Sequence, residues 1–170
     1  MGKPPLFASF LVLSLAAGLA FADREGAKPS TYVDGTYGFS LNAPRFPAVE
    51  RRTATVFQAS AAPVDGFEAN LNVQVQPMNM DRDQFRKLSL AQFAKEGWKV
   101  TVDRDLTVSG HDAVFWEFEG KSEGEEYCWI ALAVIDKPRV IMATCTSLKR
   151  HLAEHEKEFR ASLDSLRLAP

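Results

Sequence analysis

The chain has only two cysteines among its 170 residues, Cys128 and Cys145, so a network of disulfides cannot hold its fold together. It also lacks an excess of either charge, because 20 basic and 22 acidic side chains leave a net charge of −2. That balance disfavours nucleic acid and anionic membrane surfaces as partners. Internal repeats, low-complexity tracts and Asn-x-Ser/Thr sites are missing as well. The fold must therefore depend on one ordinary hydrophobic core.

Long apolar runs are absent except at the N-terminus. Lys3 precedes an apolar stretch over residues 6–22, which closes on Ala20-Phe21-Ala22. A positive start, an apolar run and a small-x-small site are typical of a cleavable secretory signal peptide; a retained N-terminal anchor is the alternative. We expect residues 1–22 to be removed on export, with a short flexible leader at 23–31.

After export and cleavage we expect the protein to be secreted or periplasmic; the same kind of signal also directs proteins to an organelle lumen. The sequence has no cysteine directly after the apolar run, so we expect no lipid attachment and no membrane insertion after cleavage. Residues 32–168 have the length of a single domain. Hydrophobic residues make up 46% of the chain and charged residues 25%, which are usual globular values.

The clearest strand pattern covers residues 67–75, where apolar and polar side chains alternate. Continued by one residue, the polar positions form an uncharged amide stripe of Asn70, Asn72, Gln74 and Gln76. Such a stripe is either a contact surface for a partner or a glycan, or a set of amides hydrogen-bonded under a flanking helix. We favour the second interpretation.

Other patterns predict the rest of an α+β domain. A capping box at Asp81 and Gln84 predicts a helix over residues 84–95, and apolar residues at steps of three and four predict a C-terminal helix from 148 to 166, capped by Thr146 or Ser147. Short turns predict antiparallel neighbours among the strands between these helices. The expected strands are 37–41, 53–61, 98–108, 113–119, 126–135 and 139–146.

Short signatures along this order of elements resemble the PsbP-like family. They are Gly66-Phe67-x-x-Asn70-x-Asn72-Val73, Asp81-x-x-x-Phe85, Gly110-x-x-Ala113, Thr144-Cys145-Thr146 and Phe159-x-x-Ser162-Leu163-x-Ser165-Leu166. The resemblance implies a PsbP/Mog-type α/β/α sandwich, in which an antiparallel sheet of six or seven strands is flanked by helices. The family includes an extrinsic photosystem II subunit, a Ran-binding protein and exported bacterial proteins, without shared catalysis. A binding or assembly role is what the likeness implies.

The two cysteines are candidates for a disulfide. If Asp136-Lys137 is a two-residue turn, Cys128 lies directly opposite Cys145 at a non-hydrogen-bonded position, close enough for a bridge. The expected compartment is oxidising. We predict a Cys128–Cys145 disulfide, with two buried free thiols as the alternative, because Pro138 cannot donate the turn hydrogen bond.

Two histidines could chelate a metal. His151 and His155 lie one helical turn apart in a His-x-x-Glu-His pattern, which some zinc hydrolases share. A third ligand is not evident, so the favoured interpretation is a helix rim with a partly buried histidine. Ser109, His111 and Asp112 crowd one turn, where adjacent side chains diverge, and we interpret them as turn residues.

The sequence thus predicts no catalytic residue, no metal and no cofactor. We expect an exported, non-catalytic binding or assembly module that acts through a sheet face or a helix–sheet cleft. Its partner would be another exported protein or a small ligand. A small exported hydrolase, with a metal site on the C-terminal helix, is the alternative.

Overall fold

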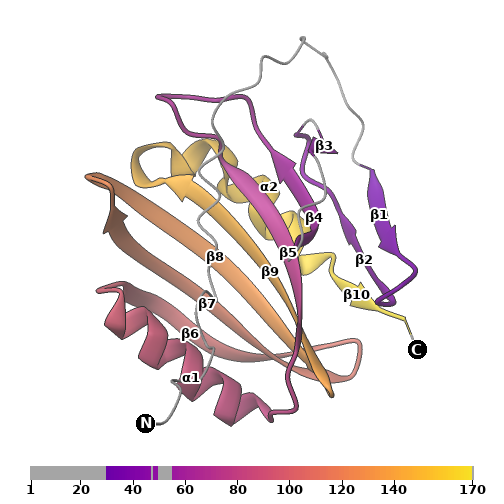
Figure 1. Cartoon of the computed structure of the whole chain (residues 1–170). Helices are drawn as coiled ribbons and strands as arrows, with labels where there is room; N and C mark the ends of the chain where they lie inside the picture. The colour runs from indigo at the N-terminus through magenta and orange to yellow at the C-terminus, as the bar shows by residue number, and fades with distance from the viewer. Residues whose placement is uncertain (1–29, 47, 50–54, 170) are drawn as a thin grey trace, which may run out of the picture.

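In the computed structural model, residues 30–46, 48–49 and 55–169 are described, and they form two antiparallel sheets with two α-helices (Figure 1). The larger sheet has seven strands in the order β3-β4-β5-β9-β8-β7-β6. Its strands are β3 (Ala48–Val49), β4 (Thr55–Ser60), β5 (Asn70–Pro77), β6 (Lys99–Val108), β7 (His111–Ser122), β8 (Glu125–Asp136) and β9 (Arg139–Leu148). The predicted α+β class with an antiparallel sheet is confirmed.

The last four strands of this sheet form the predicted meander. β6, β7, β8 and β9 follow one another through short turns, and each pairs with the next. β9 then pairs on its other side with β5, which comes before the meander in the chain. This return contact places β4 and β5 beside β9, so residues far apart in sequence share one surface.

The helix α1 (Arg82–Lys95) begins at the predicted capping box. The backbone N–H of Gln84 donates to Asp81 Oδ1 over 2.8 Å, and the backbone N–H of Asp81 donates to Gln84 Oε1 over 3.1 Å. Gly97 follows the helix with a φ of +74°, a conformation that other residues adopt at a cost. The helix buries Phe85 and Phe93, whose burial contributes about 1.5–3 kcal/mol each.

The C-terminal helix α2 (Leu152–Asp164) begins later than its sequence pattern predicted. A 3-10 turn, η1 (Lys149–His151), precedes α2, and no side chain caps either of them. Ser147, one of the two predicted caps, instead donates its Oγ hydrogen to the Leu148 carbonyl. Phe159 and Leu163 of the predicted stripe are buried. Arg160 and Glu156, one helical turn apart, form an ion pair at 2.7 Å. Arg150, in the preceding turn, bonds Asp65 and Glu125.

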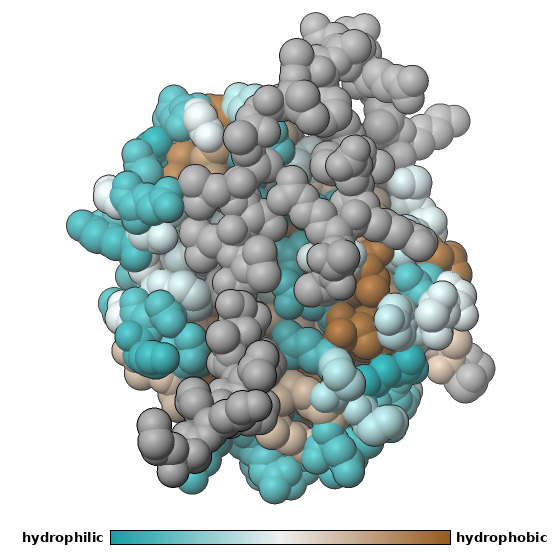
Figure 2. All heavy atoms as spheres, in the orientation of Figure 1, coloured by the Kyte–Doolittle hydropathy of each residue, from teal (hydrophilic) through white to brown (hydrophobic). Residues whose placement is uncertain are grey.

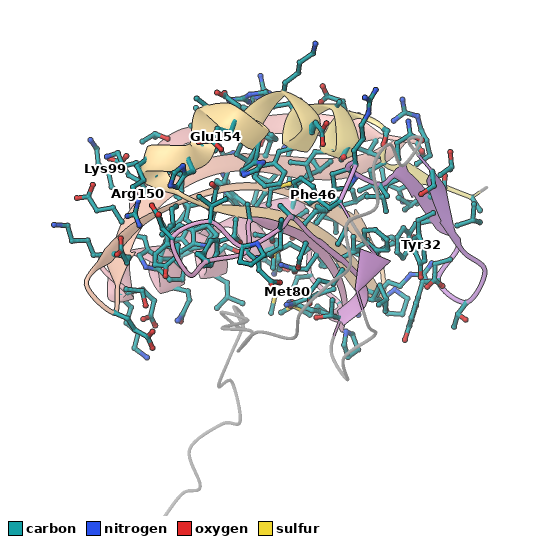
Figure 3. The ribbon with its side chains drawn as sticks, turned by 90° about the horizontal axis from the view of Figure 1, so that it is seen from above. Tyr32, Phe46, Met80, Lys99, Arg150 and Glu154 are labelled. Carbon is teal, nitrogen blue, oxygen red and sulfur yellow. The ribbon has the colours of Figure 1, made fainter. Side chains whose placement is uncertain are left out.

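The two helices lie on opposite faces of the large sheet. α2 packs with Phe159 and Leu163 against a core that includes Leu71 of β5 and Ile130 of β8. α1 packs against a second core on the other face, around Trp116 and Trp129. Seen from above, the sheet forms an arch with α2 over its outer side (Figure 3). The interior is thus two apolar layers separated by the sheet.

The smaller sheet was not fully predicted. It contains β1 (Thr31–Asp34), β2 (Phe39–Asn42) and β10 (Arg167–Leu168), in the order β1-β2-β10. Thr31, expected in the leader, already belongs to β1. Residues 1–22, expected as a signal peptide, and residues 23–29 of the leader lie outside the described residues. Among the described helices, none combines the length and the apolar character that crossing a membrane requires.

Candidate functional site: the polar half of one sheet face

The helix α1 covers only part of its face of the sheet. It packs on β6 and β7, where the rings of Phe85 and Phe93 lie 6.1 and 5.6 Å from that of Trp116. This part of the face, which we call the covered half, is apolar. Its buried sheet residues include Val114, Trp116 and Phe118 of β7 and Tyr127, Trp129, Ala131, Ala133 and Ile135 of β8.

The other part of the same face is polar and carries no charge. Asn72 of β5 pairs with both Gln58 of β4 and Thr144 of β9, and the alternation of strand side chains places all three opposite the α2 face. Residues two positions before and after these three, along the same strands, have side chains on the same face. We call this set the polar half; its members are Gln58, Ser60, Asn70, Asn72, Gln74, Gln76, Thr144 and Thr146.

The amide stripe predicted at Asn70, Asn72, Gln74 and Gln76 therefore exists on β5, and neither of the two described helices packs over it. α1 lies over the covered half, and α2 packs on the opposite face. Figure 2 shows the molecule from the α1 side, where hydrophilic residues lie near the centre of the face. The stripe is thus one row of a wider polar surface.

Hydrogen bonds within the polar half leave several groups without a partner. Gln58 Nε2 donates to Ser60 Oγ over 3.5 Å, and Gln76 Nε2 donates to Gln74 Oε1 over 3.4 Å, both long for hydrogen bonds. The atoms Gln58 Oε1, Gln76 Oε1 and Thr144 Oγ1 are buried without a partner. Each such atom costs about 1–3 kcal/mol unless water or a ligand satisfies it.

One cross-strand row concentrates these unpaired groups. Trp116, Ala131, Thr144, Asn72 and Gln58 lie opposite one another on five consecutive strands, β7-β8-β9-β5-β4. Trp116 Nε1 is also buried without a partner. The row therefore offers a donor at one end and an acceptor at the other, with the small methyl group of Ala131 between. Strands lie about 4.8 Å apart, so the row spans roughly 19 Å.

Two hollows lie elsewhere on the described surface. One, of about 380 Å³, is lined by Lys99, Glu119, Lys121 and Lys149 among others. Its charges are paired: Lys149 Nζ lies 2.8 Å from Glu119 Oε2, and this hydrogen bond lowers the pKa of Glu119 and raises that of Lys149. The other, of about 420 Å³, lies between residues 42–45 and α2. Neither hollow contains an unpaired buried polar atom of the polar half.

The two histidines do not converge on a common point. His151 Nδ1 lies 2.7 Å from Glu154 Oε1 and its Nε2 lies 2.9 Å from Asp65 Oδ2, contacts that raise the histidine pKa. His155 instead packs its ring on Phe46, 5.5 Å away and nearly perpendicular. Figure 3 shows Arg150 and Glu154 at the same end of α2. Among the described residues, no group of three or more candidate ligands is placed to hold a metal.

The predicted register of the two cysteines is wrong. Cys128 pairs with Ser147, and Cys145 pairs with Ile130, because Asp136 and Arg139 pair directly across the turn. The cysteines are diagonal neighbours on the α2 face, a separation of roughly 7–8 Å that a disulfide does not span without backbone movement. In the structure both are free, buried thiols, and burial raises the pKa of each.

The turn residues Ser109, His111 and Asp112 bind three different partners. Ser109 Oγ accepts from the backbone N–H of Leu168, and His111 and Asp112 face Asp136 and Arg82. They do not form a relay. Sequence reasoning did not identify Gln58, Ser60, Thr144, Thr146 or Trp116 as site residues. Alternation within their strands was visible, but only the register places them beside the stripe.

No protein-family model matches the sequence, and no curated protein matches it. Solved structures do resemble it. LpqN of Mycobacterium tuberculosis, involved in cell envelope biogenesis, has a TM-score of 0.64 at 10% identity, over 84% of this chain and 91% of its own. A Pseudomonas aeruginosa protein of unknown function, titled a putative regulator, has a TM-score of 0.57 at 18% identity, over 79% and 92%.

The third similar structure carries the family name that the sequence signatures indicated. Cyanobacterial PsbP of Synechocystis has a TM-score of 0.55 at 12% identity, over 88% of this chain and 98% of its own. Identities this low demonstrate a shared fold and no more. The antiparallel sheet between two helices is accordingly a PsbP-like fold, as the sequence signatures predicted.

Proposed function

We propose that this protein is an exported, non-catalytic binding or assembly module, and that the polar half is its binding site. The observation that carries the proposal is the presence of buried, unpaired amide and hydroxyl groups on a part of the sheet that α1 does not cover. A purely structural surface gains nothing from such groups, whereas a ligand that bonds them repays their cost.

Two further observations support export and binding. The signal-peptide pattern of residues 1–22 predicts export, and one protein of the same fold takes part in cell envelope biogenesis. A hydrolase, by contrast, would need His151 and His155 to approach one metal, and their rings have separate partners. We therefore prefer the binding module to the hydrolase.

Site-specific photo-cross-linking in the producing cells tests this function. A benzoylphenylalanine at position 72 reports on the polar half, and the same residue at position 92, on α1, is the matched control. We expect position 72 to capture a defined partner that position 92 does not. The capture should disappear in the Gln58→Leu/Thr144→Val double variant and be reproduced with the purified partner. Equal adducts from both positions, or none from position 72, would contradict the proposal.

Export is tested in the same cells by mass spectrometry of the chain in the exported fraction. A mature form that begins near residue 23 is expected. A full-length chain retained inside the cell would contradict the exported part of the proposal and leave the binding site open to a partner there.

A further inference from the structure

We infer that the ligand of the polar half is an uncharged, extended peptide segment that lies along β5. This inference rests on the proposed function and names the chemistry of its ligand. It follows from three properties of the polar half: the repeat of its side chains, the chemical nature of their groups and the absence of charge.

The repeat of the stripe matches that of an extended peptide. Asn70, Asn72, Gln74 and Gln76 are every second residue of β5, so they recur about every 6.7 Å along the strand. In an extended peptide, the N–H and C=O groups that point to one side also recur every second residue, at the same spacing. A peptide laid edge-on along β5 can therefore place one backbone group near each amide. From Asn70 to Gln76, the contact would take about seven peptide residues.

The groups of the stripe and of its neighbours on β4 and β9 offer the same donors and acceptors as the edge of a β-strand. An Asn or Gln carboxamide offers two N–H donors and a carbonyl acceptor, the same groups that a strand offers its neighbour. Gln58 Oε1 and Gln76 Oε1 are unpaired acceptors suited to peptide N–H groups. Thr144 Oγ1, with no partner, can donate to a peptide carbonyl.

Burial and charge favour this ligand over the alternatives. Gln58 and Thr144 are 4% and 3% exposed, so neighbouring side chains must turn aside before a peptide reaches them. The bonds then form away from bulk water, where hydrogen bonds are stronger. No member of the polar half is charged, so a charged peptide would lose hydration there without gaining a partner. A sugar commonly stacks on an aromatic ring, but the nearest ring of the cross-strand row, Trp116, is 0% exposed.

Selection from a random dodecapeptide library, displayed on phage, tests the inference with the protein purified from cells that express the full chain. We expect the selected peptides to share a stretch of about seven residues without charge. Synthetic copies should shift the backbone resonances of β4, β5 and β9. Because the polar half is uncharged, the Kd should change by less than about twofold between low and high salt.

An N-methyl scan of a selected peptide gives the sharpest result. Methylation removes one backbone donor at a time, so it should weaken binding at every second residue and leave the intervening residues nearly unaffected. The Gln58→Leu/Thr144→Val double variant should raise the Kd roughly tenfold. The matched control Gln92→Leu removes an amide from α1, where it bonds Glu96, and should leave the Kd unchanged.

The outcomes separate this inference from the proposed function. Neutral oligosaccharides, for example cello- and chito-hexaose, are titrated in parallel. If they shift the resonances of the polar half and the peptides do not, the inference is wrong and the binding site stands. Enrichment of charged peptides, or a methyl scan without the two-residue period, also overturns the inference. If neither probe affects the polar half and cross-linking finds no partner, both proposals fall.

Discussion

The two halves of one sheet face solve the same packing problem differently. In the covered half, Phe118 stacks on Phe93 of α1 at 4.3 Å and on Trp129 at 5.2 Å, and the side chains are apolar. In the polar half, neither described helix packs on the same β-sheet, and Gln58 and Thr144 keep unpaired polar atoms. The comparison separates residues that stabilise the fold from residues that keep unpaired polar groups.

The largest expected effect lies in the covered half. Phe118→Ala removes a ring that is 2% exposed and contacts both α1 and β8, so the free energy of unfolding should fall by about 3–5 kcal/mol. Urea denaturation, followed by tryptophan fluorescence, measures the change. Leu88→Ala, at a residue of α1 that is 38% exposed, is the control and should cost far less. Similar losses in the two variants would mean that α1 is not held by this ring stack.

A second substitution tests how tightly the covered half is packed at its edge. A Cβ on Gly120 would clash with Trp98 Cδ1, so Gly120→Ala must push the indole ring aside. Overpacking of this kind should lower the free energy of unfolding by about 1–3 kcal/mol. Gly124→Ala offers a comparison in which the Cβ meets nothing within 4 Å and only the positive φ of +87° opposes it. Unchanged near-ultraviolet dichroism of the tryptophans in Gly120→Ala would show that Trp98 does not pack there.

The polar half should respond with the opposite sign. Thr144→Val keeps the shape of the side chain and removes the unpaired Oγ1, so stability should be unchanged or raised by about 1 kcal/mol. Ser147→Ala is the matched hydroxyl removal on the same strand. There Oγ donates to the Leu148 carbonyl over 3.0 Å, and its loss should cost about 1 kcal/mol. A loss of more than about 1 kcal/mol in Thr144→Val would mean that its hydroxyl is a structural group.

The sequence predicts those features of this contrast that depend on residues close together in the chain, and misses those that depend on residues far apart. The capping box of Asp81 and Gln84 and the order of the meander are local, and both were predicted correctly. The amide stripe on β5 was also visible, since alternation within one strand needs no partner. The pairing of β5 with β9 joins segments separated by α1 and three strands, and no local pattern encodes it.

Register was the second limit. The expected turn at Asp136-Lys137 is displaced, because Asp136 pairs with Arg139 and binds its guanidinium at 2.6 Å. That shift moved Cys128 opposite Ser147 and removed the predicted cysteine pair. The unpaired atoms of the polar half likewise depend on which side chains meet across β4, β5 and β9. The strands β1 and β10 were missed because segments of four and two residues carry little periodic signal.

The smallest expected effect is a dependence of stability on pH. It should arise from His151, Asp65 and Glu154, which form ion pairs at the start of α2, and not from the polar half. Hydrogen bonds to Asp65 and then Glu154 raise the pKa of His151 above its ordinary value of 6.5. When the pKa of a histidine is higher in the folded protein than in the unfolded chain, its protonation stabilises the fold. The full contribution is present at pH values below the unfolded-state pKa, and it is lost as the pH rises through the folded-state pKa. The pKa of Asp65 is lowered from 3.8, chiefly by the bond from His151, so its contribution is lost in more acidic solution.

The Tm difference between the wild type and His151→Gln should therefore be largest between about pH 4 and pH 6.5 and shrink toward pH 9. Thermal unfolding at a series of pH values measures it; a difference that stays constant over this range would mean that His151 titrates normally. Peptide binding should instead be flat over the same pH range, because no member of the polar half titrates. If binding follows the protonation of His151, the ligand contacts the start of α2, on the other side of the sheet. The polar half would then not be the site that binds it.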